Sequence, residues 1–491
     1  MRKVIMSVLV VAFAALSAQA QTKIFKEVGD EISSQMKTIR QDNALVGYMV
    51  FTQLEKVSED SFNYKVTIMD ENLNDIGAVT FRDITMVLQD VSFENDVICV
   101  AYLKGNLLGT QSNGKKDYTE ASANRQNSVF LQFISLDGKI IKTSSYPVNI
   151  EIEEQENAFS SKRTTYGFLA YPPQLKNISQ KGFACFFGQR NDGYLLVFNP
   201  KGDILWSKRV KKQARAFYML TSGNNIYLLW KEEPSVIRKT WSHFGNEDFL
   251  ITERGYWLLG YSAKDTTVEL NDSLKDDRFN NLKVLSFEID PATGKPCIAG
   301  LLTKPKKDDY LGVFTTNING LTAEQISTVS TYWDSNPLAA AEDSRSFEKH
   351  INHTEISNAF RDFNGNTCFT AFTSFAGSEV FKQNSEGKLS VASNILSERT
   401  MPFRPGPMPG SKRNEKSFYR LFNTDTKTSY LIIDDLVNIS IYNIDQKKVM
   451  HTIPHKDSGI VTYVYPAKEG YIMIAEYNKK EKYTKFSIEA L

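Results

Sequence analysis

Residues 181–210 hold the pattern that most restricts the fold of this chain: two apolar runs and a third, mixed run, joined by short polar turns. The second turn contains Pro200, whose ring holds φ at about −65°, and Gly202, which adopts positive φ without strain. Three short strands joined by such turns predict an antiparallel β-meander. Looser copies of this unit recur along the chain, so most of the protein is predicted to be built from meanders.

Several of the predicted strands are apolar at consecutive positions, as in residues 194–198, 226–230 and 471–475. Strands of this kind are buried on both faces. In an α/β protein helices cover those faces, but no helical pattern lies between successive strands here. The covering layers are therefore predicted to be other sheets, which a ring of antiparallel blades supplies on both sides. We predict an all-β fold, a single β-propeller with loop and helical insertions.

The number of blades is predicted from the tight turns, whose centres lie near residues 72, 137, 201, 292, 386 and 446. These centres indicate six or seven blades, because insertions stretch some of the intervals. The strands near Leu45 and Tyr483 are expected to pair and close the ring. The alternative is two β-domains, such as sandwiches, because about 470 residues exceed the usual size of a single hydrophobic core.

Residues 1–20 have the pattern of a secretory signal peptide. Arg2 and Lys3 precede a short apolar run, and residues 18–20 (Ala-Gln-Ala) form a cleavage signal, so the mature chain is predicted to begin at Gln21. The apolar run is too short for a membrane span. We expect an exported protein, periplasmic or extracellular, with no transmembrane segment in the mature chain.

The rest of the chain divides into a predicted N-terminal helix or linker, residues 21–43, and the propeller, residues 44–491. The helix is predicted over residues 23–40, where apolar residues recur at helical spacing: Ile24, Phe25, Val28, Ile32, Met36 and Ile39. Insertions are expected at about 232–280, 321–353 and 397–416. The second insertion is predicted to be helical and to start at a capping box formed by Thr322 and Gln325.

The charge of the chain is nearly balanced, with 58 basic and 57 acidic residues and a formal net charge of +1. This balance gives no overall attraction to nucleic acid, and we predict no nucleic-acid partner. The four cysteines lie far apart in strand-like runs, and none has the spacing of a zinc site. We expect buried thiols, with one or two disulfides as the alternative.

Two insertions carry the residues best suited to recognising a partner. The first contains Trp241, Tyr256 and Trp257, whose flat rings suit a sugar or a peptide. The second, rich in proline, contains Phe403 and Arg404. Loops on a rigid scaffold commonly carry function, so these five residues form the predicted binding set. The alternative is that the aromatic residues pack into small cores of the insertions.

Other polar patterns favour ordinary structural roles. Asp362, Asn364 and Asn366 place oxygens at alternate positions as a calcium loop does, but Gly365 comes too early for that loop, and a β-turn is the better interpretation. The basic cluster in residues 208–215 is interpreted as a solvated blade edge rather than a polyanion site. No spacing indicates a catalytic group, a metal site or a cofactor, and we predict none.

The signal peptide, the start at Gln21 and the degenerate blades with D/N-x-x-G turns resemble uncharacterised exported proteins of Bacteroidota. The resemblance implies an exported bacterial protein and brings no activity with it. We therefore predict an exported, non-enzymatic, monomeric propeller that binds a protein or a glycan through its loops. Two alternatives stay open: a hydrolase, for example a glycan-active one, with carboxylates in the central channel, and a structural component of the cell envelope.

Overall fold

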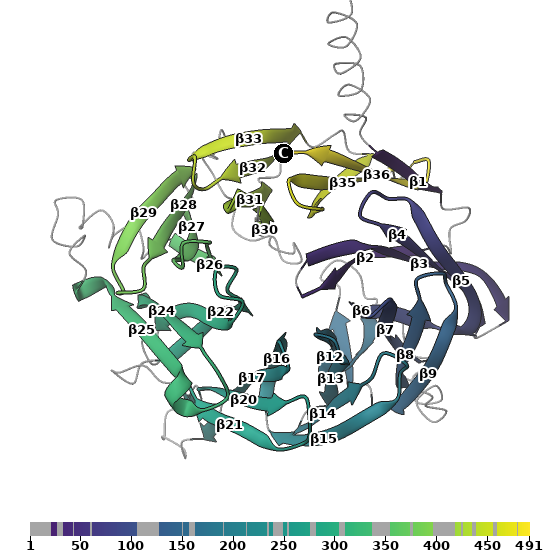
Figure 1. Cartoon of the computed structure of the whole chain (residues 1–491), viewed down its shortest axis with the longest axis horizontal. Coiled ribbons are helices and arrows are strands. Elements are labelled where there is room, and N and C mark those ends of the chain that lie inside the picture. The colour runs from purple at the N-terminus through teal and green to yellow at the C-terminus, as the bar shows by residue number, and fades with distance from the viewer. Residues whose placement is uncertain are drawn as a thin grey trace, which may run out of the picture.

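The chain forms a ring of eight four-stranded antiparallel sheets, the blades of a β-propeller (Figure 1). The structure is a computed structural model that describes residues 21–26, 33–42, 44–58, 61–105, 127–149, 151–156, 163–189, 191–212, 214–232, 235–238, 249–252, 255–274, 281–303, 310–335, 354–373, 377–395, 418–423, 426–434, 438–454, 459–478 and 480–491. No α-helix occurs in these ranges. The chain is an all-β propeller, as predicted, but the predicted number of six or seven blades is wrong.

The first four blades also carry two additional hairpins. Blade 1 consists of β2 (Ser33–Gln41), β3 (Ala44–Ser58), β4 (Ser61–Asp70) and β5 (Asp75–Ile84). Blade 2 consists of β6 (Met86–Glu94), β7 (Val97–Lys104), β8 (Ser128–Ser135) and β9 (Ile140–Pro147), and the hairpin β10 (Glu151–Glu156) and β11 (Arg163–Phe168) follows it. Blade 3 consists of β12 (Tyr171–Ile178), β13 (Gly182–Gln189), β14 (Asn191–Phe198) and β15 (Ile204–Lys212). Blade 4 consists of β16 (Ala214–Ser222), β17 (Asn225–Glu232), β20 (Tyr256–Ser262) and β21 (Val268–Ser273), with the hairpin β18 (Ser235–Arg238) and β19 (Phe249–Thr252) between β17 and β20.

The last four blades complete the ring. Blade 5 consists of β22 (Asn281–Ile289), β23 (Pro296–Thr303), β24 (Tyr310–Ile318) and β25 (Ile326–Tyr332). Blade 6 consists of β26 (Thr354–Arg361), β27 (Thr367–Thr373), β28 (Gly377–Gln383) and β29 (Leu389–Ile395). Blade 7 consists of β30 (Phe418–Asn423), β31 (Thr428–Asp434), β32 (Asn438–Asn443) and β33 (Lys448–Pro454). Blade 8 consists of β34 (Ile460–Pro466), β35 (Tyr471–Asn478), β36 (Tyr483–Ala490) and β1 (Gln21–Lys26).

The blades were undercounted because two of them lack a recognisable turn. The predicted turn centres fall in six different blades, and all but the one near residue 292 join a third strand to a fourth. In blade 4 the corresponding turn, residues 263–267, contains neither glycine nor proline. In blade 8 the fourth strand comes from the other end of the chain, so no turn leads to it.

The N-terminal strand closes the ring. β1 pairs antiparallel with β36, from Gln21 opposite Ile488 to Lys26 opposite Tyr483. The predicted helix over residues 23–40 is therefore wrong: residues 23–26 lie in β1 and residues 33–40 lie in β2, and residues 27–32 lie outside the described residues. Its apolar residues serve different cores, because Phe25 packs between blades 8 and 1 whereas Ile39 packs between blades 1 and 2. The predicted closure near Leu45 is also wrong, because β3 pairs within blade 1.

Neighbouring blades cover one another on both faces. Among the described residues there are eight clusters of buried apolar side chains, one at each junction between blades. Second strands hold long buried runs: every residue of β23 and all but the last of β7 are buried. Full burial of a large apolar side chain contributes about 1.5–3 kcal/mol, so a blade outside the ring would lose cover on both sides.

All four cysteines lie in second strands, in blades 2, 3, 5 and 6: Cys99, Cys185, Cys297 and Cys368. Each is buried and none forms a disulfide, which confirms the expected buried thiols. Cys99 and Cys185 pack into the same cluster between blades 2 and 3. Burial raises the pKa of both thiols well above the ordinary value, because a thiolate is poorly solvated there.

Polar side chains join the innermost strands of neighbouring blades. An innermost strand is a sheet edge, so some of its N–H groups have no strand partner. At four junctions a side-chain oxygen of one innermost strand accepts a hydrogen bond from such an N–H group of the next, which satisfies the donor. These inner-strand hydrogen bonds join Gln35 to Leu88 (3.2 Å), and Asp90 to Leu175, Gln174 to Met219 and Glu288 to Arg361 (2.8 Å each).

The predicted helical insertion at 321–353 falls only partly within the described residues. A 3₁₀ turn, η1 (Ala323–Gln325), follows Thr322, whose N–H donates to Oε1 of Gln325 (3.3 Å), as the capping box predicts. The strand β25 and a second 3₁₀ turn, η2 (Trp333–Ser335), come next, and residues 336–353 lie outside the described residues. Within the described ranges, no helix has the length and apolar character that crossing a membrane requires.

Closure of the ring by β1 predicts that Phe25→Ala destabilises the protein. The Phe25 ring meets Phe486 edge to face, with centroids 5.5 Å apart, in the core between blades 8 and 1. We expect a loss of about 2–3 kcal/mol in the free energy of unfolding, measured in urea. Ile24→Ala is the matched control, because Ile24 lies in the same strand and is 53% exposed. Equal effects of the two changes would contradict closure by this strand.

Burial of the cysteines predicts that none of the four thiols reacts with an aromatic disulfide reagent in the native protein. Burial keeps the reagent from all four thiols, and the raised pKa of Cys99 and Cys185 also suppresses their thiolates. After unfolding without reductant, all four thiols should react. A titration that finds fewer than four in the unfolded chain would show a disulfide and contradict the structure.

Candidate functional site

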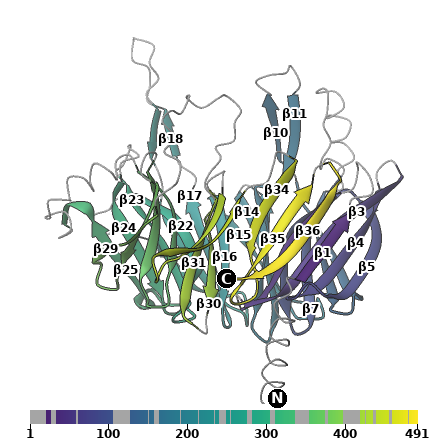
Figure 2. The ribbon, with the colours of Figure 1, turned by 90° about the horizontal axis from the view of Figure 1, so that it is seen from above.

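The connections between strands give the ring two different faces. First-to-second and third-to-fourth connections lie on one face, which we call the turn face, and the others lie on the loop face. Between described strands of the turn face, the longest connection is residues 319–325. The longest connections of the loop face are residues 105–127, 148–170, 233–255, 333–353 and 396–417. Figure 2 shows β10, β11 and β18 standing out from the ring on one side.

An aromatic ladder lies in blade 4 where its long insertion begins. Phe217, Trp230 and Trp257 are register neighbours on β16, β17 and β20. The ring centroids of Phe217 and Trp230 are 6.2 Å apart, and those of Trp230 and Trp257 are 6.0 Å apart with the rings at 14°. Trp230 is buried between blades 3 and 4, and Trp257 is partly buried. The ladder therefore runs from the core to the root of the insertion.

A cation and an unsatisfied donor accompany the ladder. The Nζ of Lys212, at the end of β15, lies 5.2 Å from the ring centroid of Trp230 and 6.0 Å from that of Trp257. A cation over an indole face contributes about 0.5–1 kcal/mol at an exposed site. The Nε1 of Trp230 is buried and has no hydrogen-bond partner among the described residues. An acceptor that reached this point from the loop face would therefore meet both a donor and a positive charge.

Of the five predicted binding residues, the structure describes two. Tyr256 is buried, and the Nζ of Lys231 lies 5.4 Å from the centroid of its ring. Trp257 belongs to the ladder. Both residues pack at the base of the insertion against the ring. Trp241, Phe403 and Arg404 lie outside the described residues, and their part in binding stays a prediction.

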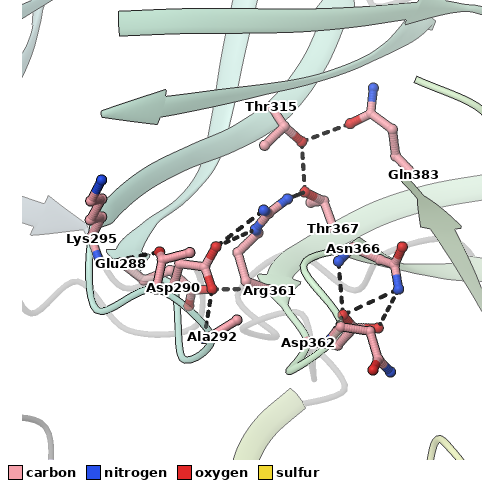
Figure 3. Close-up of polar contacts among 12 residues, drawn as sticks. Glu288, Asp290, Ala292, Lys295, Thr315, Arg361, Asp362, Asn366, Thr367 and Gln383 are labelled. Carbon is pink, nitrogen blue, oxygen red and sulfur yellow. Dashed lines mark hydrogen bonds and ion pairs between the residues drawn. The ribbon is translucent and has the colours of Figure 1, made fainter. Parts of the chain in front are cut away.

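A buried polar network joins blades 5 and 6 on the turn face (Figure 3). The side chain of Arg361, the last residue of β26, donates from Nε to Asp290 (3.1 Å) and from Nη1 to the hydroxyl of Thr367 (3.0 Å). The Thr315 hydroxyl bonds both the Thr367 hydroxyl and Oε1 of Gln383, at 2.7 Å each. The network fixes the position of a positively charged group beneath the protein surface. No sequence pattern had indicated this network.

Asp362 organises a turn that joins blade 6 to blade 7. Its Oδ1 accepts hydrogen bonds from N–H groups of the turn, including that of Asn366 (2.8 Å), which confirms the β-turn interpretation. Its Oδ2 lies 3.0 Å from the Nζ of Lys382, which is 3.8 Å from Asp445 of blade 7. Burial disfavours the charged form of Lys382, but Cys368 and the two carboxylates together raise its pKa. Within the described residues, no cluster of His, Cys, Asp and Glu is suited to hold a metal ion.

The basic cluster of residues 208–215 makes contacts within the ring. Arg209 donates from Nε to Asp192 on the adjacent strand (2.8 Å), and this hydrogen bond lowers the pKa of the carboxyl group. Lys212 covers the aromatic ladder. These contacts agree with the interpretation of the cluster as a blade edge.

Comparisons with known proteins leave the activity open. Residues 1–106 match DUF6770, a family of unknown function, and this match covers blade 1 and the first two strands of blade 2. No curated protein matches the chain.

Solved structures with similarity to the chain include propellers. A protein of unknown function from Bacteroides caccae is 11% identical with a TM-score of 0.31, covering 60% of this chain and 87% of that one. The β-propeller domain of Myceliophteria thermophila Cps50 (Swd1) is 7% identical with a TM-score of 0.37, covering 83% and 99%. The WD40 domain of SCAP from fission yeast is 8% identical with a TM-score of 0.30, covering 96% and 98%.

The stacked indoles predict an exciton couplet in the far-ultraviolet circular dichroism spectrum, because two indole rings with centroids 6.0 Å apart couple their transitions and the twist between neighbouring strands skews the two transition moments. Trp257→Phe should remove the couplet while the aromatic contact with Trp230 persists. Trp333→Phe is the control, because Trp333 packs between blades 5 and 6. A couplet that survives in the Trp257 variant would contradict the ladder.

Proposed function

We propose that this protein is an exported binding scaffold that holds a protein or a glycan on the loop face of its propeller. The distribution of the insertions carries the proposal: the long connections gather on one face, and the other face is made of short turns. Loops that vary on a rigid framework commonly form binding sites, because the framework fixes their ends.

The framework accepts these insertions because the strand ends that flank them are already joined. Lys104 and Ser128, on either side of one insertion, are register partners. In blade 4 the N–H of Glu232 donates to the carbonyl oxygen of Gly255 (3.2 Å), and this bond closes the base of the insertion that these two residues flank. Lengthening such a loop adds little closure entropy, so the loop face is free to be shaped for a ligand.

The export half of the proposal rests on residues 1–20 and on the place of β1. The first residue after the predicted cleavage site, Gln21, is also the first residue of the strand that closes the ring. Removal of residues 1–20 would therefore leave the closing strand complete. The resemblance to exported proteins of Bacteroidota supports a bacterial source.

Three acidic residues of the innermost strands support binding over the alternative of a channel hydrolase. Asp90 and Glu288 each accept a backbone hydrogen bond from the next blade. Glu94 is buried, and its carboxylate accepts hydrogen bonds from the side chain of Asn177 (3.0 Å) and the N–H of Gln180 (2.9 Å). These three carboxylates are used to hold blades together.

The proposal predicts that excision of residues 233–254 abolishes capture of the partner and leaves the propeller folded. The deletion is bridged with a two-residue Asn-Gly turn between Glu232 and Gly255, whose backbones already bond each other. The mature chain is immobilised and tested on an array of purified glycans and, separately, by cross-linking to isolated bacterial surface proteins. We expect either the glycans or the surface proteins to include a ligand that binds saturably. The excision should weaken the affinity for this ligand at least about 10-fold, which is about 1.4 kcal/mol.

The control is Lys201→Ser combined with Lys388→Ser, two surface changes on the turn face. This variant should bind as the unaltered chain does. Equal loss in both variants would contradict a loop-face site. If shortened glycan is released during the assay, the alternative of a glycan-active hydrolase would replace the proposal. If the protein sediments with envelope fragments and binds neither glycans nor proteins saturably, the alternative of a structural component of the cell envelope would replace the proposal.

A further inference from the structure

A polar cavity of about 250 Å³ lies on the turn face between blades 5 and 6. Among the residues that line it, those used below are Asp290, Lys295, Asn317, Asn319, Ser327 and Arg361. The cavity opens on the side of the ring opposite to the insertions, so it is independent of the proposed loop-face site. Its volume is below the usual range for drug-sized ligands, about 300–1,000 Å³, and suits a molecule of monosaccharide size.

Arg361 brings a fixed positive charge to this cavity. Its side chain is 9% exposed, and that of its partner Asp290 is 4% exposed. Asp290 uses both carboxylate oxygens: Oδ1 accepts from the N–H of Ala292 (2.8 Å), and Oδ2 accepts from Nε of Arg361 (3.1 Å) and forms an ion pair with Nη2 (3.1 Å). Among the described residues, two of the five N–H donors of the guanidinium make hydrogen bonds, Nε to Asp290 and Nη1 to Thr367, and a third, on Nη2, is taken up by the ion pair with Asp290. Two donors remain for a ligand.

Lys295 adds a second cation on the exposed side of the cavity. Its Nζ donates to Oδ1 of Asn319 (3.2 Å), which holds the ammonium group over the third-to-fourth turn of blade 5. An ammonium group has three N–H donors, so this bond leaves two. The lining residues thus include two cations, Arg361 and Lys295, and one carboxylate, Asp290, both of whose oxygens already accept hydrogen bonds. Because the two cations outnumber the one carboxylate, the cavity favours a bound anion.

The neutral lining adds a requirement for hydroxyl groups. Asn317 and Asn319 offer amide donors and acceptors, and Ser327 offers a hydroxyl. Such groups bind the hydroxyls of a sugar, and paired cations bind a carboxylate through charge-assisted hydrogen bonds. We propose that this cavity binds a small hydroxylated carboxylate of the uronic acid class, with the carboxylate on Arg361 and Lys295 and the hydroxyls on the amides.

Isothermal titration calorimetry of the full mature chain tests the proposal with D-glucuronate, D-galacturonate, D-glucose and inorganic phosphate. We expect saturable binding of at least one uronate with a Kd of about 1 mM or tighter. D-Glucose, which keeps the hydroxyls and lacks the carboxylate, should bind at least about 10-fold more weakly. No saturable uronate binding, or phosphate binding as tight as that of the best uronate, would overturn the assignment.

Lys295→Ala should weaken uronate binding about 10-fold, and Lys295→Arg should retain it within a few-fold, because the charge is kept. Lys295 is exposed, so its replacement leaves the fold intact. Lys201→Ala, at an exposed turn of blade 3 on the same face, is the matched control and should bind normally. The chain lacking residues 233–254 should also bind uronate normally, which separates this site from the loop face. Undiminished binding in Lys295→Ala would place the uronate elsewhere and overturn the proposal.

Discussion

Each blade has two apolar faces, and each face is stable only when a neighbouring blade covers it. Ring closure follows from this constraint, because an open ring would leave one face of blade 1 and one of blade 8 in water. The closing pair joins residues 21–26 to β36, nearly the whole length of the chain apart. Contacts this far apart in sequence form late, since the intervening chain must first be ordered. β1 can therefore pair only after β36, the last strand of the chain, has formed.

Apolar burial has no direction, so polar contacts are needed to set how one blade meets the next. The inner-strand hydrogen bonds do this at four junctions. The two whose acceptors are carboxylates, Asp90 and Glu288, are bonds to charged groups, which contribute about 1.5–3 kcal/mol each. At the junction of blades 5 and 6, Arg361 takes part twice: its N–H donates to Glu288, and its guanidinium pairs with Asp290. The groups that align these two blades are thus the same groups that give the neighbouring cavity its positive charge.

Local chemistry was predictable from the sequence, and long-range pairing was not. Gly202 has φ +83° in its turn, as expected for the D/N-x-x-G pattern, and residues 194–198 form a strand buried largely on both faces. The helix predicted over residues 23–40 failed because residues that serve different blade junctions happened to fall at helical spacing. The Asp290–Arg361 pair is 71 residues apart and has no local pattern. The only nearby sequence features that could have pointed to this junction were the two turn-forming residues, Asp290 and Asp362.

The contrast between the two faces follows from where the blades are tied together. On the turn face, each of several connections contacts a strand of another blade: Asp42 of blade 1 accepts from Asn177 of blade 3 (2.8 Å), Gly294 accepts from Ser222 (2.9 Å), and Asp445 lies 3.8 Å from Lys382. An insertion into one of these turns would displace a group that another blade depends on. On the loop face, the strand ends are joined below the insertions, as at Glu232 and Gly255, so a new loop leaves the junctions intact. The turn face can therefore hold only a site made from its own structural groups, and the loop face can acquire new ones.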